Sequence, residues 1–485
     1  MRQIVITPDP GLLESMRSIG YTVESAVADV IDNSIAAAAK NVDVLFSGAG
    51  PFEIAIVDDG TGMNRNGTVE SMRLAATSPT AERKKDDLGR FGLGLKTASL
   101  SQCRTLTVAS RRDGVTTILR WSLDHVLESG DWSVLELDHV EASGLLGWEV
   151  FAALESGTLV HWGDLDLLAM TAGPQQSDLD RIATQVRDHI ALVFHLFIAG
   201  DGVRRVDFAV NGGAVQGIDP FFSTSKKTQQ TDWEPINVDG EQVRLKAFTL
   251  PYLNRLTAKD REIALKLGGL RETQGFYVYR GGRLVIWGTW FRVAPRSEMA
   301  KLTRVRVDIP NSLDHLWALD VKKSTASPPP QVRQRLSELA RTMMMPSQKV
   351  QEFRGRKVSQ AVNVDLMWGL RVNGDEFRYE LNLDHPTLNA FAQSLTTEQR
   401  RQFELVLEDI QSTFPVIDAH NRMSGDKIPE IDDSEVELID RARESWQLMK
   451  GVGIDRETFI TNLSRAEPYY LISGFDKKIR EALDA

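Results

Sequence analysis

Four short segments in the first third of the chain bring carboxylates, an amide and closely spaced glycines into a fixed order: residues 29–33, 58–63, 89–96 and 156–158. Carboxylate and amide oxygens bind hard cations and accept hydrogen bonds, while glycines let backbone N–H groups approach an anion. Each segment alone is weak evidence, because Asp-Gly and paired glycines are common in turns. Together they supply a metal ligand, a carboxylate that could recognise the adenine base, a phosphate cradle and a wall that closes the site. This combination predicts an ATP site.

The first segment lies on a predicted helix over residues 24–39, where apolar residues recur at helical spacing on one face. Asp29 and Asn33 are four residues apart, so they share the opposite face. A nucleoside triphosphate binds together with Mg²⁺, which prefers oxygen ligands and keeps several waters, and Asn33 could supply one ligand. Asp29 could polarise an attacking water. The alternative interpretation is a solvated polar helix face without a ligand.

The second segment follows a predicted strand and suits the recognition of adenine. Asp58 could accept a hydrogen bond from the adenine amino group, and Gly60 and Gly62 would let the backbone approach the ring. Met63 would pack on the base as a soft apolar surface. Thr158 of the fourth segment could support Asp58, or it could be an ordinary strand threonine. A tight Asp-Gly turn without any ligand is the competing interpretation.

The third segment has the spacing of a phosphate cradle. Gly89, Gly92 and Gly94 precede a predicted helix, so free backbone N–H groups and the positive helix end would face an anion. Lys96 would add a positive charge. A Rossmann dinucleotide site is disfavoured, because the glycines follow a long polar loop rather than a strand. A Walker P-loop is also disfavoured, because its Gly-Lys-Ser/Thr ending is absent from the sequence.

Short β-rich runs and helices around these segments predict an α+β sandwich, a largely antiparallel sheet with helices on one face. Residues 64–88 are polar and predict a mobile loop. A Gly/Pro/Gln/Ser-rich stretch and later a proline run indicate two boundaries. We therefore expect three domains, at residues 1–172, 173–345 and 346–485, of which the last is mostly helical.

Composition limits the classes of protein that the chain can represent. The length of 485 residues favours two or three domains, and one cysteine excludes an internal disulfide framework. The sequence has no apolar run of membrane-spanning length and no signal-peptide pattern, which predicts a cytoplasmic protein without a membrane partner. A net charge of −10 argues against nucleic-acid binding by the whole surface, but it is compatible with a local basic groove.

The order and spacing of the four segments resemble the GHKL ATPases, which include DNA gyrase, MutL, ninety-kilodalton heat-shock chaperones, MORC proteins and histidine kinases. The helix with Asp29 is similar to their N-box, and the other segments are similar to their three glycine boxes. The resemblance implies the Bergerat α/β sandwich, with an ATP lid at about residues 64–96. The nucleotide-binding residues that it implies are Asn33 (also the Mg²⁺ ligand), Asp58, Gly60, Gly62, Met63, Gly89, Phe91, Gly92, Leu93, Gly94, Leu95, Lys96 and Thr158.

Residues 274–285 resemble the second, transducer domain of MORC and bacterial MutL-like ATPases, which is similar to domain 2 of ribosomal protein S5. In gyrase, MutL and MORC this domain contributes a lysine to the γ-phosphate, which implies a catalytic role for Lys323 or Lys322; a solvated surface pair is the alternative. The family base is usually glutamate, so the shorter Asp29 predicts slow hydrolysis. The chain also has Ala36 where many members carry an aspartate.

This resemblance implies an ATP-driven clamp, in which Mg-ATP orders the lid, two copies dimerise and hydrolysis reopens them. Bacterial members resemble components of restriction and phage-defence systems, which implies a nuclease or helicase partner and DNA. The basic residues that could contact DNA phosphates are Arg280, Arg283, Arg292, Arg304 and Arg306, unless they are ordinary surface arginines. A second hypothesis is a slow or non-hydrolysing ATP sensor that recruits an effector through its helical C-terminus. A chaperone role is a third, weaker hypothesis.

Overall fold

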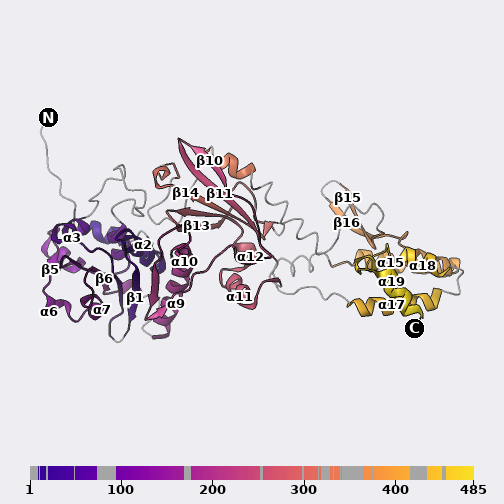
Figure 1. Cartoon of the computed structure of the whole chain (residues 1–485), viewed down its shortest axis with the longest axis horizontal. Coiled ribbons are helices and arrows are strands. Elements are labelled where there is room, and N and C mark those ends of the chain that lie inside the picture. The colour runs from indigo at the N-terminus through magenta and orange to yellow at the C-terminus, as the bar shows by residue number, and fades with distance from the viewer. Residues whose placement is uncertain are drawn as a thin grey trace. The chain divides into compact units, whose positions relative to one another are not determined.

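The chain forms two compact units, Met1–Ser347 and Gln348–Ala485, which we describe separately (Figure 1). The computed structural model describes residues 9, 11–17, 20–48, 50–73, 94–168, 176–251, 255–297, 300–314, 316–317, 328–330, 332–338, 340, 365–373, 376–415, 434–449 and 455–484.

The first unit begins with an eight-stranded sheet in the order β5-β4-β3-β6-β2-β1-β7-β8. Its pairs are antiparallel except for the parallel pair of β1 and β7. The strands are β1 (Asn41–Ser47), β2 (Glu53–Asp58), β3 (Thr105–Arg112), β4 (Val115–Ser122), β5 (Leu135–Glu136), β6 (Gly157–Gly163), β7 (Asp207–Val210) and β8 (Gly213–Ala214). The predicted antiparallel sheet of an α+β sandwich is therefore confirmed.

Helices cover both faces of this sheet, whereas the sequence predicted helices on one face only. The larger core is built with side chains of α1 (Leu12–Arg17), α2 (Val23–Ala36), α4 (Gly94–Leu100), α5 (Leu123–Ser129), α9 (Gln176–Val193) and α10 (His195–Ala199). A second core lies under α6 (His139–Ala142) and α7 (Trp148–Ala152). These two helices are only four and five residues long, too short to give a clear apolar period in the sequence.

The beginning of the expected lid is a helix and not a loop. Helix α3 (Arg65–Met72) starts at Asn64, whose side chain accepts a hydrogen bond from the Gly67 amide at 2.9 Å. Trp121 anchors its other end by donating from Nε1 to the Met72 carbonyl at 2.9 Å. The prediction of a mobile loop from residue 64 was wrong for this segment. Its polar sequence gives no clear apolar period, but the helix is capped at Asn64 and packs through Thr68 and Met72.

A second sheet follows in the order β10-β11-β14-β12-β13, with β9 paired to β11. Its strands are β9 (Gln229–Gln230), β10 (Glu234–Val238), β11 (Glu241–Thr249), β12 (Gly275–Arg280), β13 (Arg283–Thr289) and β14 (Thr303–Ile309). The short helices α11 (Ala258–Lys266) and α12 (Gly269–Glu272) lie between β11 and β12 in sequence, and η3 (Asn311–Leu313) follows β14. Strands β12 and β13 form a hairpin, and β12 runs parallel to β14.

Helices α9 and α10 connect the two sheets of the first unit. Ile190 and Phe194 pack in the core of the first sheet, while Leu192 and Leu196 pack against Tyr279 of the second. Strands β7 and β8, which follow α10, also complete the first sheet. Residues 176–214, which follow the expected boundary at 172, therefore contribute strands and core helices to the first sheet. Helices α9 and α10 pack against the first sheet and the second.

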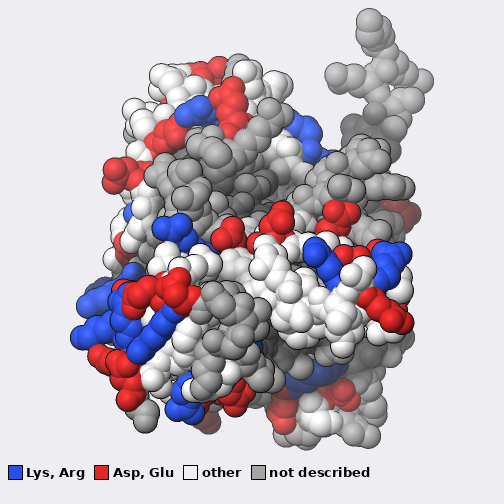
Figure 2. Space-filling model, turned by 90° about the vertical axis from the view of Figure 1, so that its right-hand side faces the viewer, with Lys and Arg blue, Asp and Glu red and all other residues white. Residues whose placement is uncertain are grey.

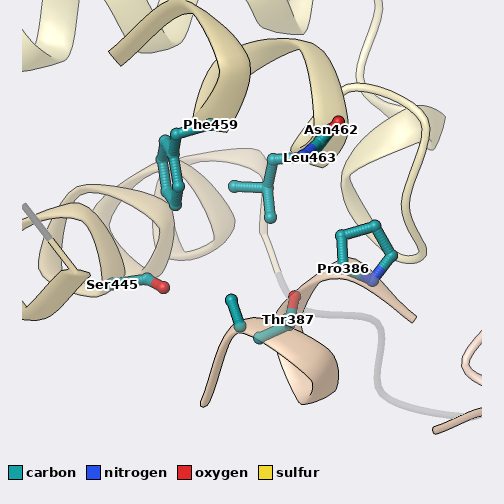
Figure 3. A pocket seen from close by; sticks show the side chains of 7 residues that line it. Pro386, Thr387, Ser445, Phe459, Asn462 and Leu463 are labelled. Atoms are coloured by element: carbon teal, nitrogen blue, oxygen red, sulfur yellow. The ribbon is translucent and has the colours of Figure 1, made fainter. Parts of the chain in front are cut away.

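Within the described residues, the C-terminal unit has a helical core and a β-hairpin. It contains β15 (Trp368–Asn373), β16 (Glu376–Leu381), α14 (Pro386–Ser394), α15 (Thr397–Ser412), α17 (Glu435–Met449), α18 (Arg456–Leu463), η4 (Tyr469–Leu471) and α19 (Phe475–Asp484). A small pocket lies between α14, α17 and α18 (Figure 3). Its lining residues carry no charge, so it does not suit a triphosphate. In the part of the chain that the structure describes, no helix combines the length and apolar character needed to span a membrane.

Candidate nucleotide-binding site

Helix α2 positions the first group of predicted site residues. Thr22 caps it, and a reciprocal capping box with Ser25 fixes where it begins. The helix ends at Ala36 rather than near residue 39, and Arg204 donates a hydrogen bond to the Ile35 carbonyl at 2.8 Å. Every residue from Ala26 to Asp32 is buried, so the helix is enclosed on its polar side as well.

Asp29 is buried and held by two donors. Its side chain is 2% exposed, its Oδ1 lies 3.0 Å from Nη1 of Arg283, and its Oδ2 accepts a hydrogen bond from the Tyr21 hydroxyl at 3.0 Å. Arg283 also forms an ion pair with Asp32, one helical turn along. The alternative interpretation of a solvated polar face is therefore wrong for Asp29. Burial, followed by the charge of Asp29, raises the pKa of the Tyr21 hydroxyl, so Tyr21 remains a donor.

Asn33 is the exposed polar side chain at the end of this otherwise buried stretch of α2. Its Nδ2 donates to the Asp29 carbonyl at 3.3 Å, which directs the amide along the helix. An exposed amide beside a buried helix fits the donor set of a Mg²⁺ ion that takes most of its oxygens from phosphates and water. The structure thus leaves Asn33 accessible and encloses Asp29.

Asp58 stands at the end of β2, where β2 and β6 place it opposite Thr158. It is 5% exposed, and Ser34 of α2 donates its hydroxyl to Oδ2 at 2.8 Å. The Gly60 amide donates to Oδ1 at 2.9 Å. Burial raises the pKa of Asp58 to about 6, although the hydrogen bonds from Gly60 and Ser34 oppose this shift. Residues from α2, β2 and β6 therefore meet at this carboxylate.

A network of short hydrogen bonds joins the second and fourth predicted segments. Ser156 donates to the Gly60 carbonyl at 2.9 Å, and the Met63 amide donates to the Ser110 hydroxyl at 2.9 Å. That hydroxyl also lies 3.0 Å from Oγ1 of Thr158. The structure therefore brings together the residues that the sequence assigned to the adenine, and it adds Ser110, which sequence reasoning missed.

Two glycines allow the backbones of these segments to meet. Gly62 has a φ of +61°, and a Cβ atom there would lie 1.9 Å from the Arg111 carbonyl oxygen. Gly157 has a φ of +151°, and a Cβ atom would lie 2.1 Å from the carbonyl oxygen of Asp58. Both contacts are with backbone, so neither can be relieved by rotating a side chain. Glycine is required at both positions.

Substituting Gly157 with alanine is expected to separate β6 from Asp58. We predict that Gly157→Ala weakens ATP binding by at least about tenfold and lowers the melting temperature by about 5 °C or more, because a backbone clash adds to an unfavourable φ. Calorimetric titration and thermal unfolding measure the two effects. Gly114→Ala is the matched control, since Gly114 also has a positive φ (+75°) but faces open space. Equal effects of both substitutions would contradict the predicted role of the close approach.

The third segment is only partly described. Gly94 and Leu95 open helix α4, and Lys96 is buried with its Nζ donating to the Ser71 carbonyl at 2.9 Å. Burial lowers the pKa of Lys96 to about 8, while the charge of Glu70 opposes the shift. In this structure Lys96 anchors the end of α3, and its charge is turned toward that carbonyl. Gly89, Phe91, Gly92, Leu93, Lys322 and Lys323 lie outside the described residues.

The arginines proposed to contact DNA are mostly committed to protein partners. Arg280 forms an ion pair with Asp314 at 2.7 Å, and Arg283 forms one with Asp29. Arg304 is fully buried and donates to Thr273 at 2.6 Å, and Arg306 is paired with Asp308 at 2.8 Å. The proposal of a phosphate-binding surface is therefore wrong for Arg280, Arg283 and Arg304. A strand sequence with alternating arginines does not reveal which arginines face a buried acid.

Comparison with known proteins agrees with this geometry. Residues 21–156 match the family described as "Histidine kinase-, DNA gyrase B-, and HSP90-like ATPase". The chain carries a GHKL ATPase domain. A DNA mismatch repair protein MutL from Paramagnetospirillum magneticum is 32% identical in an alignment 271 residues long, which covers 51% of this chain and 40% of that protein. The chain thus matches less than half of the length of that relative. The GHKL resemblance drawn from the four segments is confirmed, and the domain supports ATP binding.

Proposed function

We propose that this chain hydrolyses Mg-ATP and acts as an ATP-gated dimeric clamp. The hydrogen bond between Ser34 and Asp58 carries the proposal. It connects α2, which holds the proposed metal ligand Asn33, to the carboxylate proposed to recognise adenine. Ser34 follows Asn33 directly, so the same turn of α2 presents the proposed metal ligand and contacts the carboxylate proposed for adenine. An Asp-Gly turn with no further role would not require a hydrogen bond from a buried serine of α2.

We assign a role to each of the main residues of the site. Asp58 accepts a hydrogen bond from the adenine amino group, and Thr158 supports it from β6. Asn33 would provide an amide oxygen to a Mg²⁺ ion, which would neutralise phosphate charge when bound with ATP. Asp29 accepts the proton of a water that attacks the γ-phosphorus, while the bond to the leaving ADP oxygen breaks. Lys323 or Lys322 would contribute the charge at the γ-phosphate.

The proposals of a clamp and of its biological role are based on proteins with similar GHKL domains. The similar protein from Paramagnetospirillum magneticum is named for DNA mismatch repair, which supports a proposal that DNA is the clamped polymer. We further propose a role in restriction or phage defence with a nuclease or helicase partner. On the face drawn in Figure 2, Lys and Arg lie beside Asp and Glu rather than forming one basic surface. Arg292 is exposed and remains a candidate for a phosphate contact.

A sensor that recruits an effector is the second candidate function. Helix α15 of the separate C-terminal unit leaves Leu405, Val406 and Ile410 about half exposed, with 46%, 54% and 46% of each residue accessible. Apolar side chains on one exposed helix suit a protein partner. The burial of Asp29 would then limit hydrolysis, and ATP would act mainly through binding. Turnover of the purified protein separates this candidate from the clamp.

Dimerisation driven by Mg-ATP is the direct test of the clamp. We expect light scattering to show a monomer without nucleotide and a dimer with excess Mg²⁺ and a non-hydrolysable ATP analogue. Asn33→Ala should remain monomeric under the same conditions, because the phosphates lose a metal contact. Asn41→Ala is an Asn-to-Ala control at the start of β1, since among the described residues its side chain bonds Asp59 and no predicted nucleotide-binding residue. A monomer in wild type at every nucleotide concentration would contradict the clamp.

A further inference from the structure

Arg283 connects the second sheet to the buried acids of the GHKL domain. It is the first residue of β13, and its Nη1 contacts Asp29 across 254 positions of sequence. The same nitrogen pairs with Asp32. All three side chains are at most 6% exposed. The second sheet therefore reaches the predicted catalytic base with a charged side chain.

The β12–β13 turn is shaped to bring Arg283 to this place. Gly282 has a φ of +86°, and a Cβ atom there would lie 2.5 Å from Cγ1 of Val203 and 3.4 Å from Phe197. The hairpin thus packs directly on the segment that follows α10. The Arg283 guanidinium also lies over the Phe194 ring, 5.7 Å from its centroid. Packing from two sides fixes the direction in which Arg283 points.

Stability is an incomplete explanation for three charged side chains in this position. Burial of an ion pair costs desolvation energy that the attraction between the charges only partly offsets. Apolar side chains of similar size often stabilise a fold to the same degree or more. Nε of Arg283 is also buried without a hydrogen-bond partner among the described residues. A buried donor without a partner is unfavourable for stability. This cost indicates that Arg283 serves to hold Asp29 in a particular position.

We propose that Arg283 is a positioning residue for Asp29. With Tyr21 it holds the carboxylate in one orientation, so that the base is already placed when Mg-ATP and water arrive. In this proposal Arg283 acts through Asp29 and not on the nucleotide, and the inference rests on the proposed role of Asp29 as base.

Steady-state hydrolysis by Arg283→Gln tests the proposal. We expect kcat to fall by about ten- to a hundredfold, because the base is no longer fixed. The Kd of a non-hydrolysable Mg-ATP analogue should stay within about twofold, because Arg283 is not a nucleotide ligand. Arg283→Lys should recover part of kcat, since it restores the positive charge without the planar fork.

Arg280→Gln is the matched control. Arg280 pairs with Arg283 in the register of the same hairpin, is equally buried and forms its own ion pair with Asp314. Its loss should disturb the hairpin and leave kcat near the wild-type value. An equal fall of kcat in Arg280→Gln and Arg283→Gln would overturn the positioning role, because the effect would then come from the hairpin as a whole.

Arg283→Gln leaves two buried carboxylates without their cation, so folding must be checked by thermal unfolding. Arg283→Gln/Asp32→Asn removes one of these charges and should show the same loss of kcat if the single variant fails to fold. Combining Arg283→Gln with Asp29→Asn should cause no further loss beyond Asp29→Asn. Additive losses would overturn the inference alone. Unchanged turnover in Asp29→Asn would overturn both the inference and the proposed catalytic role of Asp29.

Discussion

Asp29→Asn is expected to reduce ATP turnover by about a hundredfold or more while ATP binding is retained. Asparagine has nearly the same shape but cannot accept the proton of the attacking water, and general-base catalysis contributes about 10²–10⁴-fold. The fold should persist, because Arg283 keeps its ion pair with Asp32 and the buried cluster loses one negative charge. Phosphate release under saturating Mg-ATP measures the effect.

The matched control for this prediction is Asp32→Asn, which removes the neighbouring acid on the same face of α2 and the other partner of Arg283. It should affect turnover far less, because Asp32 is not assigned to the water. If both variants hydrolyse ATP at the same rate, Asp29 is not the base. If Asp29→Asn also forms a dimer with ATP that does not dissociate, hydrolysis is the step that reopens the clamp.

The parts of the fold and site that depend on local pattern could be predicted from the sequence. The β2 strand and its ending at Asp58 follow from a short β-rich run before an Asp-Gly turn. Gly62 and Gly157 belong to the predicted motifs, although the sequence placed Gly62 against the adenine ring and not against the Arg111 backbone. The meeting of Asp58 with Thr158 is a pairing of adjacent strands, which the order of the glycine boxes already implied.

The parts that depend on tertiary packing could not be predicted. The apolar period of α2 indicates one buried face, but it cannot show that Arg283 of a distant strand covers the other. The position of Lys96 in a glycine-rich segment suggests an anion contact, yet its Nζ binds a carbonyl at the end of α3. Gly281 and Gly282 before Arg283 are typical of a tight turn, but they do not identify the acid that the turn reaches.

Asp58→Asn is expected to weaken ATP binding by about ten- to a hundredfold. A hydrogen bond to a charged acceptor contributes about 1.5–3 kcal/mol, and asparagine offers one neutral oxygen where Ser34 and Gly60 already occupy both carboxylate oxygens. Calorimetry with ATP and with inosine triphosphate, which lacks the amino group, measures the contribution. Wild type should prefer ATP, and Asp58→Asn should bind the two nucleotides with similar affinity.

The pH dependence of binding follows from the same carboxylate. Because burial raises the pKa of Asp58 to about 6, the side chain becomes protonated as the pH falls through 6 and loses its charge as an acceptor. The preference for ATP over inosine triphosphate should therefore decrease between pH 7.5 and pH 5. The raised pKa also means that the folded state binds the proton more tightly than the unfolded state. Its contribution to stability is thus present below pH 4 and is lost as the pH rises through 6. A preference that is constant over this pH range in wild type, or retained in Asp58→Asn, would show that Asp58 does not read the adenine.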